Sequence, residues 1–172
     1  MTETFIAVRD FLEMGGQVLN VIAVVIFLMW MLILERITYF QSELKTLKAT
    51  IKSTWNARID KKSWASEALR EKLISEFNMS ANQYLPIIKT LVALCPLLGL
   101  MGTVTGMIEV FDVMAVSGSG NARSMASGVS KATIPTMAGM VGALSGVFLA
   151  TLLTQKVTNE VDILEEELSQ DD

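Results

Sequence analysis

The sequence has no histidine, one cysteine and three prolines, and only 19% of its 172 residues are charged. The lack of histidine excludes a histidine-ligated metal site, and a single cysteine excludes a disulfide framework within the chain. Apolar residues make up 51% of the sequence and fall into long uncharged blocks. Blocks of this kind exclude a disordered tail and are typical of a membrane protein.

Three uncharged blocks are long enough to cross a membrane as helices, which takes about 20 residues. They cover 19 residues from Gly16 to Leu34, 19 from Thr90 to Ile108 and 24 from Ala132 to Gln155. The residues before the first block include three acidic side chains and one arginine, unlike the basic leader of a cleaved signal. We therefore expect three transmembrane helices, the first of them retained.

The basic residues predict the orientation of these helices. Ten of the 14 lysines and arginines lie between Glu35 and Lys89, whereas the second connection offers only Arg123. Basic connections stay in the cytoplasm, so the N-terminus is expected in the periplasm and the C-terminus in the cytoplasm.

The expected fold class is thus an all-α membrane protein with three transmembrane helices and long cytoplasmic helical extensions. Its expected parts, in chain order, are a periplasmic amphipathic segment 1–15, a first transmembrane helix 16–35, a cytoplasmic helical region 36–84, a second transmembrane helix 85–116, a periplasmic turn 117–123, a third transmembrane helix 124–155 and an acidic cytoplasmic C-terminal helix or tail 156–172.

Three apolar stripes with helical spacing predict amphipathic cytoplasmic helices, with Ser63 as the N-cap of the second. Mutual packing of these helices is favoured over a calmodulin-like or lipid-surface peptide role. The stripes are Leu44, Leu47, Ile51, Trp55 and Ile59; Ala65, Leu69, Leu73 and Phe77; and Val157, Val161, Leu164 and Leu168.

Glycines are concentrated in the second and third spans. Small residues four apart allow two membrane helices to approach closely, so the two spans are predicted to form a tightly packed hairpin. The predicted packing glycines are Gly99, Gly102, Gly106, Gly139, Gly142 and Gly146. Pro96 and Pro135 each remove a helical hydrogen bond, so kinks are expected there.

Hydroxyl side chains form a second feature of the same two spans. A row of hydroxyls facing a helix bundle can hold water, but hydroxyls do not titrate near neutral pH. If protons cross here, the group that binds and releases them must come from a partner. The alternative is that each hydroxyl bonds to its own helix. The residues are Thr103, Thr105, Ser130, Thr133, Thr136 and Ser145.

Three charges, Glu109, Asp112 and Lys131, lie at the outer ends of these spans. Glu109 and Lys131 are equally far from Gly120 along the chain, so an antiparallel hairpin puts them at the same depth. One hypothesis is an ion pair, within or between subunits, because an unpaired charge there costs at least a few kcal/mol. The other is that Lys131 extends outward to water and Glu109 lies in a wet vestibule.

The segments CPLLGLMGTVTG, from Cys95 to Gly106, and GVSKATIPTMAG, from Gly128 to Gly139, resemble the MotA/TolQ/ExbB proton-channel family, most closely its ExbB members. The resemblance implies an oligomeric ring, a homopentamer in this family, in the bacterial inner membrane. It also implies an ExbD-like single-span partner inside the ring, whose aspartate carries protons. Such a motor energises a TonB-like protein for outer-membrane uptake of iron complexes or cobalamin.

Thr103 and Thr136 match the family's pore-lining threonines. Lys131 departs from the family, since many members have glutamate there, which indicates a divergent subgroup and argues against a proton-relay role for this position. Conduction would run from the outer charges to the partner's aspartate beside the two threonines. The expected partners are further copies of the chain, the ExbD-like and TonB-like proteins and membrane lipids, with no nucleic acid and no cofactor or metal.

Two other classes remain open. The chain could be a non-conducting assembly scaffold, which Lys131 favours, or a TolQ-like or MotA-like stator of another machine. A membrane-embedded enzyme is disfavoured, because the spans hold no histidine, metal cluster or paired acids. Cys95 is interpreted as a small core residue instead of a nucleophile, since no histidine exists to activate it.

Overall fold

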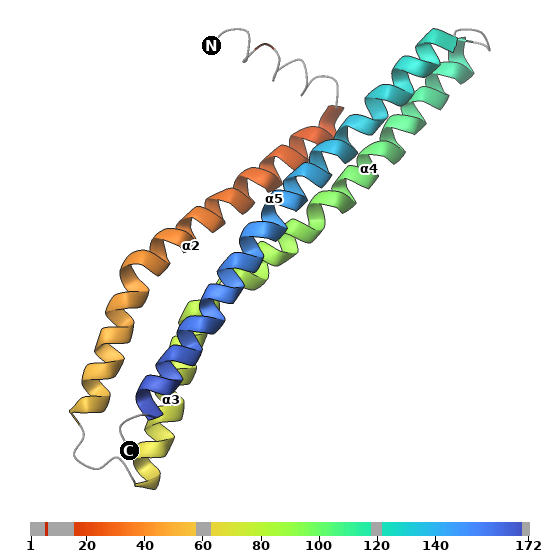
Figure 1. Cartoon of the computed structure of the whole chain (residues 1–172). Helices are drawn as coiled ribbons and strands as arrows, with labels where there is room; N and C mark the ends of the chain where they lie inside the picture. Colours follow the sequence, from red (N-terminus) through yellow and green to blue (C-terminus); the bar gives the residue numbers. More distant parts are fainter. Residues whose placement is uncertain (1–5, 7–15, 58–62, 118–121, 170–172) are drawn as a thin grey trace. The chain divides into compact units, whose positions relative to one another are not determined.

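A computed structural model describes residues 6, 16–57, 63–117 and 122–169 of the chain. These residues form four α-helices, α2 (Gly16–Asn56), α3 (Trp64–Asn82), α4 (Leu85–Ser117) and α5 (Ala122–Ser169) (Figure 1). No strand occurs in the described ranges, which confirms the all-α fold class. The predicted segment 1–15, apart from Ile6, and most of the predicted turn 117–123 lie outside the described residues.

Three stretches are long and apolar enough to cross a membrane, which confirms the three predicted spans. They are Gly16–Asn56, Trp64–Val116 and Met125–Ser169. Helices α2 and α5 contain 41 and 48 residues, about twice what a bilayer requires. The apolar parts therefore continue into the polar parts without a helix end between them.

The chain divides into two compact units. Unit 1 comprises 1–30 and 89–147, and unit 2 comprises 31–88 and 148–172. Within unit 1, α4 and the first half of α5 run antiparallel, as the green and cyan helices of Figure 1 show. Large apolar side chains cover the outside of this unit, among them Leu97, Phe111 and Val141, which are 62%, 58% and 71% exposed. An apolar exterior of this extent suits lipid or another membrane subunit.

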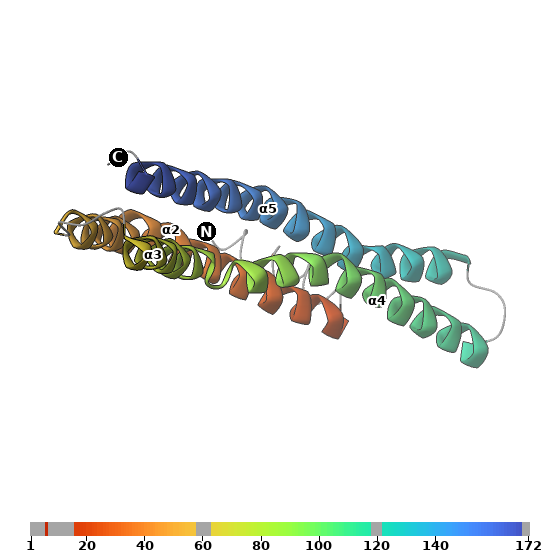
Figure 2. The same cartoon turned by 90° about the horizontal axis from the view of Figure 1, so that it is seen from below.

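Unit 2 is a bundle of α2 from residue 31 onward, helix α3 and the last part of α5, which run alongside one another (Figure 2). The three predicted apolar stripes meet in its core, which confirms their mutual packing. Their buried members are Leu44, Ile51, Trp55, Leu73, Phe77, Val157, Leu164 and Leu168. The prediction for α3 was wrong at its start, because Ala65 is exposed and Ser66 is buried instead; Ile59 lies outside the described residues.

Helix α3 begins after Ser63, as predicted. The backbone of Ser63 is extended, and its carbonyl accepts hydrogen bonds from the N–H groups of Ser66 and Glu67 at 2.8 and 3.1 Å. The Ser63 hydroxyl makes no capping hydrogen bond, so the position of the cap was right but its side chain is not used. At the other end of α3 the chain turns through Tyr84, whose φ of 65° is rare for a residue with a side chain.

Candidate functional site

Helices α4 and α5 touch backbone to backbone in unit 1. A Cβ atom placed on Gly99 would lie 2.9 Å from the Cα of Thr136 and 3.1 Å from the carbonyl oxygen of Pro135. One placed on Gly106 would lie 2.7 Å from the Cβ of Ala132. Gly139 in turn faces the Cys95 carbonyl. Only glycine fits at such contacts, because backbone atoms cannot move aside as a flexible side chain can.

The remaining glycines receive side chains. Gly102 faces the ring of Pro135, Gly142 faces Ile26 of α2, and Gly146 faces Met29 of α2. The second glycine pair of the sequence therefore accommodates side chains of α2 as well as α4, since Gly146 also faces Val92 of α4. Both prolines lie inside continuous helices, Pro96 in α4 and Pro135 in α5.

Thr136 makes a hydrogen bond between the two helices. Its hydroxyl donates to the carbonyl of Gly99 on α4 at 2.9 Å. Five other hydroxyls of the expected spans donate within their own helix: Thr103 to Leu100 at 2.7 Å, Thr105 to Gly102 at 3.1 Å, Thr133 to Ser130 at 2.8 Å, Ser145 to Gly142 at 2.8 Å and Thr154 to Ala150 at 2.8 Å. Thr136 differs from these five, which show the local bonding that polar residues of membrane helices commonly make.

Thr103 and Thr136 lie close in level and on one side of the crossing. Thr136 packs against Gly99, and Thr103 follows Gly99 by one helical turn. Each threonine also comes directly after a member of the Gly102–Pro135 contact, which turns both to the same flank of an antiparallel pair. Both side chains are half-buried. The structure therefore brings the two predicted pore-lining hydroxyls together.

The outer charges are exposed in the single chain. Glu109, Asp112 and Lys131 all have exposed side chains, and no ion pair joins Glu109 to Lys131 among the described contacts. Gly106 packs on Ala132 and Gly128 on Val110, so Glu109 and Lys131 lie at nearly the same level of the hairpin. An ion pair between subunits stays a prediction.

Cys95 occupies the centre of the crossing. It is fully buried, and its thiol donates to the carbonyl of Leu91 at 3.3 Å. No group of three or more cysteine, aspartate or glutamate side chains suited to a metal occurs in the part of the chain described.

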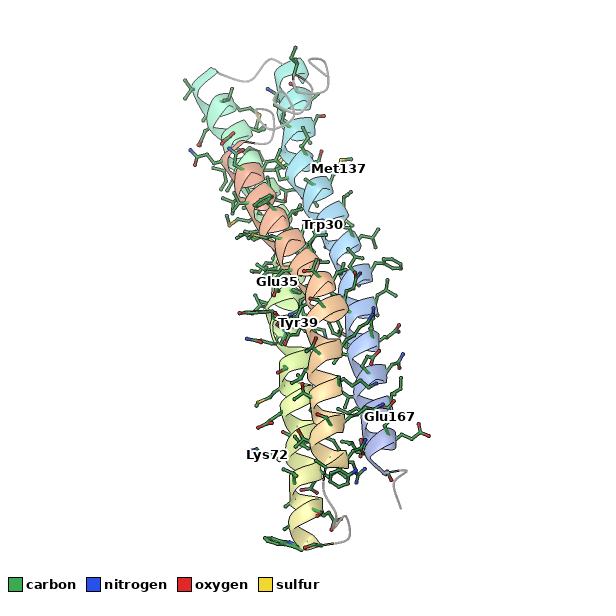
Figure 3. The ribbon with its side chains drawn as sticks, turned by 90° about the vertical axis from the view of Figure 1, so that its left-hand side faces the viewer. Trp30, Glu35, Tyr39, Lys72, Met137 and Glu167 are labelled. Carbon is green, nitrogen blue, oxygen red and sulfur yellow. The ribbon has the colours of Figure 1, made fainter. Side chains whose placement is uncertain are left out.

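Arg36 is the residue that sequence reasoning missed. It is 1% exposed in the core of unit 2, between the rings of Tyr39 and Tyr84 at 4.8 and 4.9 Å, and donates to the Ser80 carbonyl at 3.3 Å. The carboxylate of Glu35 lies 3.8 Å from the Nε of Arg36. Glu35 and Tyr39 are labelled on α2 in Figure 3. The sequence marks Arg36 only as a basic residue at the end of a span, and nothing in it predicts the contact with Tyr84.

Lysines of α2 pair with glutamates of α5 in unit 2. Lys48 lies 3.2 Å from Glu160 and 3.7 Å from Glu167, and Lys52 lies 2.8 Å from Glu167. The hydrogen bond from Lys52, and then the charge of Lys48, hold the pKa of Glu167 below its ordinary value. These pairs tie α2 to α5 in unit 2.

Comparison with known proteins identifies the family to which the chain belongs. The family model described as "MotA/TolQ/ExbB proton channel family" matches residues 38–166. A putative biopolymer transport protein ExbB-like 1 of Synechocystis sp. is 38% identical over 44% of the chain and 31% of its own length. A putative biopolymer transport protein ExbB homolog of Methanothermobacter thermautotrophicus is 28% identical over 60% of the chain and 36% of its own length. The chain thus matches about a third of each relative, and by its match to the family model it belongs to the MotA/TolQ/ExbB proton channel family.

Proposed function

We propose that this chain forms the shell of a proton-driven motor in the bacterial inner membrane, together with an ExbD-like single-span partner. The observation that carries the proposal is the lack of any Asp, Glu, Lys or Arg between Lys89 and Glu109 on α4 and between Lys131 and Lys156 on α5. Hydroxyls line these stretches, and a hydroxyl cannot pick up and release a proton near neutral pH. A partner carboxylate beside Thr103 and Thr136 supplies the missing group.

In this mechanism the chain forms the wall of the proton pathway, and the partner carries the proton. Glu109 and Asp112 attract protons at the outer mouth, and the partner's carboxylate binds them at the level of the two threonines. Moving one charge through 100 mV releases about 2.3 kcal/mol, so several protons can drive a large rearrangement. The motion energises a TonB-like protein for uptake of iron complexes or cobalamin across the outer membrane.

Several copies of the chain, five by analogy with the family, enclose the partner. The exposed apolar side chains of unit 1 support contacts with other copies and with membrane lipids. The basic connection between the first two spans supports a periplasmic N-terminus and a cytoplasmic C-terminus.

Reconstitution tests this function. The chain is placed in vesicles with and without co-purified partner, and decay of an imposed pH gradient is measured. We expect conduction only with the partner, and a loss of at least tenfold in the Thr103→Val, Thr136→Val double variant. Thr158→Val is the matched control, because Thr158 follows the expected third span 124–155 and donates to a carbonyl of its own helix, that of Thr154. Full-rate dissipation by the chain alone would disprove the proposal.

A non-conducting scaffold is the second candidate, favoured by the lysine at position 131. A scaffold keeps its biological function in the Thr103 and Thr136 variants as long as the complex assembles. Identification of the co-purified proteins separates a TonB-energising complex from a TolQ-like or MotA-like stator of another machine.

A further inference from the structure

The hydrogen bonds of Thr103 and Thr136 fix which chemistry these hydroxyls offer to a ligand. A carbonyl oxygen has no hydrogen to donate, so a hydroxyl bonded to a carbonyl must direct its own hydrogen toward it. Thr136 does this to Gly99 at 2.9 Å and Thr103 to Leu100 at 2.7 Å. Each hydroxyl hydrogen is therefore engaged, and only oxygen lone pairs are left to meet a ligand.

Pro135 adds a further acceptor next to this pair. A proline inside a helix has no N–H, so the carbonyl four residues earlier loses its usual helical donor. That carbonyl belongs to Lys131, about one turn before Thr136 on α5. The polar atoms at this level of the crossing are thus acceptors.

We propose that Thr103 and Thr136 form an acceptor site that binds a partner carboxyl group in its protonated, neutral form. The inference rests on the proposed function and specifies the state in which the carrier is held. A neutral acid donates its O–H to a threonine oxygen, whereas a carboxylate has only lone pairs to present to it. To bind a carboxylate, Thr136 would have to break its bond to Gly99.

The site divides the proton cycle into two steps. A partner carboxylate takes one proton from the periplasmic side, becomes a carboxylic acid and donates that hydrogen to a threonine oxygen. On the cytoplasmic side the acid leaves the site, gives the same proton to water and returns to the carboxylate form. The threonines gain and lose no proton in the cycle.

Carbodiimide labelling tests this site, since the reagent attacks protonated carboxyl groups. The complex of the full chain with its partner is treated with dicyclohexylcarbodiimide across a pH series, and modification of the partner's peptide is followed by mass spectrometry. We expect Thr136→Val, which removes the acceptor, to lower the pH midpoint of labelling by roughly half a unit to one unit. Thr136→Ser, which keeps a hydroxyl, leaves the midpoint unchanged.

Thr105→Val is the matched control. Thr105 also donates to its own helix, at Gly102, but lies two residues from Thr103 and so on the opposite face of α4. Its replacement leaves the midpoint unchanged. Co-purification of the partner with each variant shows that the complex is still assembled.

Two results would overturn the acceptor site alone. The first is a midpoint in Thr136→Val equal to or above that of the unaltered complex. The second is protection by Na⁺ that is lost in Thr136→Val, because the oxygens would then coordinate a cation. If no carboxyl group of the co-purified partner is labelled at any pH, the proposed function is disproved, and the acceptor site is disproved with it.

Discussion

The guanidinium of Arg36 lies over the ring of Tyr84, with 4.9 Å between Cζ and the ring centre. Tyr84 forms the turn between α3 and α4, and its φ of 65° costs about 1 kcal/mol in a residue with a Cβ. Arg36 also donates to Ser80 in the last turn of α3. One buried arginine of α2 thus stabilises both the end of α3 and the strained residue that follows it.

Replacing Arg36 tests its contribution to the stability of the α3 end and of Tyr84. Arg36→Ala should lower the free energy of unfolding by about 3 kcal/mol, because it removes a charged hydrogen bond and two cation–π contacts. The stability of Arg36→Lys should lie between those of Arg36→Ala and the original protein, since an ammonium cannot stack on both rings. Thermal unfolding in detergent measures the effect, and an Arg36→Ala protein as stable as the original would contradict the assignment.

Variants of Tyr84 separate the strain from the ring contact. Tyr84→Phe keeps the ring and should unfold like the original protein. Tyr84→Gly and Tyr84→Ala both lose the ring, but glycine adopts a positive φ freely and should be the more stable of the two by about 1 kcal/mol. Equal stability of the two variants would show that the turn is not strained.

The close contact of α4 and α5 predicts the effect of added methyl groups. Gly99→Ala and Gly139→Ala each direct a Cβ at the backbone of the other helix, so they should destabilise the membrane part by about 1–3 kcal/mol. Val141→Ala is the control, because Val141 is 71% exposed on the surface of unit 1. Resistance of the purified complex to thermal dissociation measures the difference, and identical behaviour of all three variants would argue against the crossing.

The lysine–glutamate contacts of unit 2 predict a dependence on pH. The pKa of Glu167 is lowered in the folded protein, so its stabilising contribution is present above the ordinary value near 4.5 and is lost as the pH falls through the lowered value. At pH 7, Glu167→Gln should cost less than about 1 kcal/mol, because the pair is partly exposed.

Thermal unfolding of the original and Glu167→Gln proteins is then compared at pH 7 and in acid. The difference between them should shrink on acidification below the ordinary pKa of glutamate. A difference that grows in acid would mean that the carboxylate is not the stabilising form.

Glu109 and Lys131 give a charge-reversal prediction. Glu109→Lys and Lys131→Glu should each impair function, and the double variant should restore it if the two residues pair between subunits. Growth dependent on the energised transport system is the measurement. Asp112→Lys combined with Lys131→Glu is the control for a general effect of charge, and failure of the Glu109–Lys131 double variant to recover would count against pairing.

Much of this fold follows from the sequence, because a bilayer requires long uncharged helices and such helices are conspicuous in a sequence. The stripe from Leu44 to Ile59 and that from Val157 to Leu168 predict the core of unit 2 for the same reason, since their spacing repeats with the helix. The position of Arg36 does not follow from local pattern. It depends on Tyr84, which is far along the chain and reaches Arg36 only through the tertiary fold.

The candidate site, like the fold, could be predicted from the sequence only in part. The level of Thr103 and Thr136 follows from an antiparallel hairpin, but the partner of each hydroxyl depends on details of packing that spacing does not contain. Gly142 and Gly146 illustrate this limit, since their spacing predicts close packing without saying that α2 packs there as well as α4.

Thr136 makes a hydrogen bond between α4 and α5, while glycines bring the two backbones into contact. Glycines thus supply the backbone contact, whereas Thr136 is both a hydroxyl of the candidate site and a link between the two helices. A substitution at Thr136 should therefore alter the cohesion of the pair together with the polarity of this face, whereas one at Thr103, which bonds to its own helix, should alter the polarity alone.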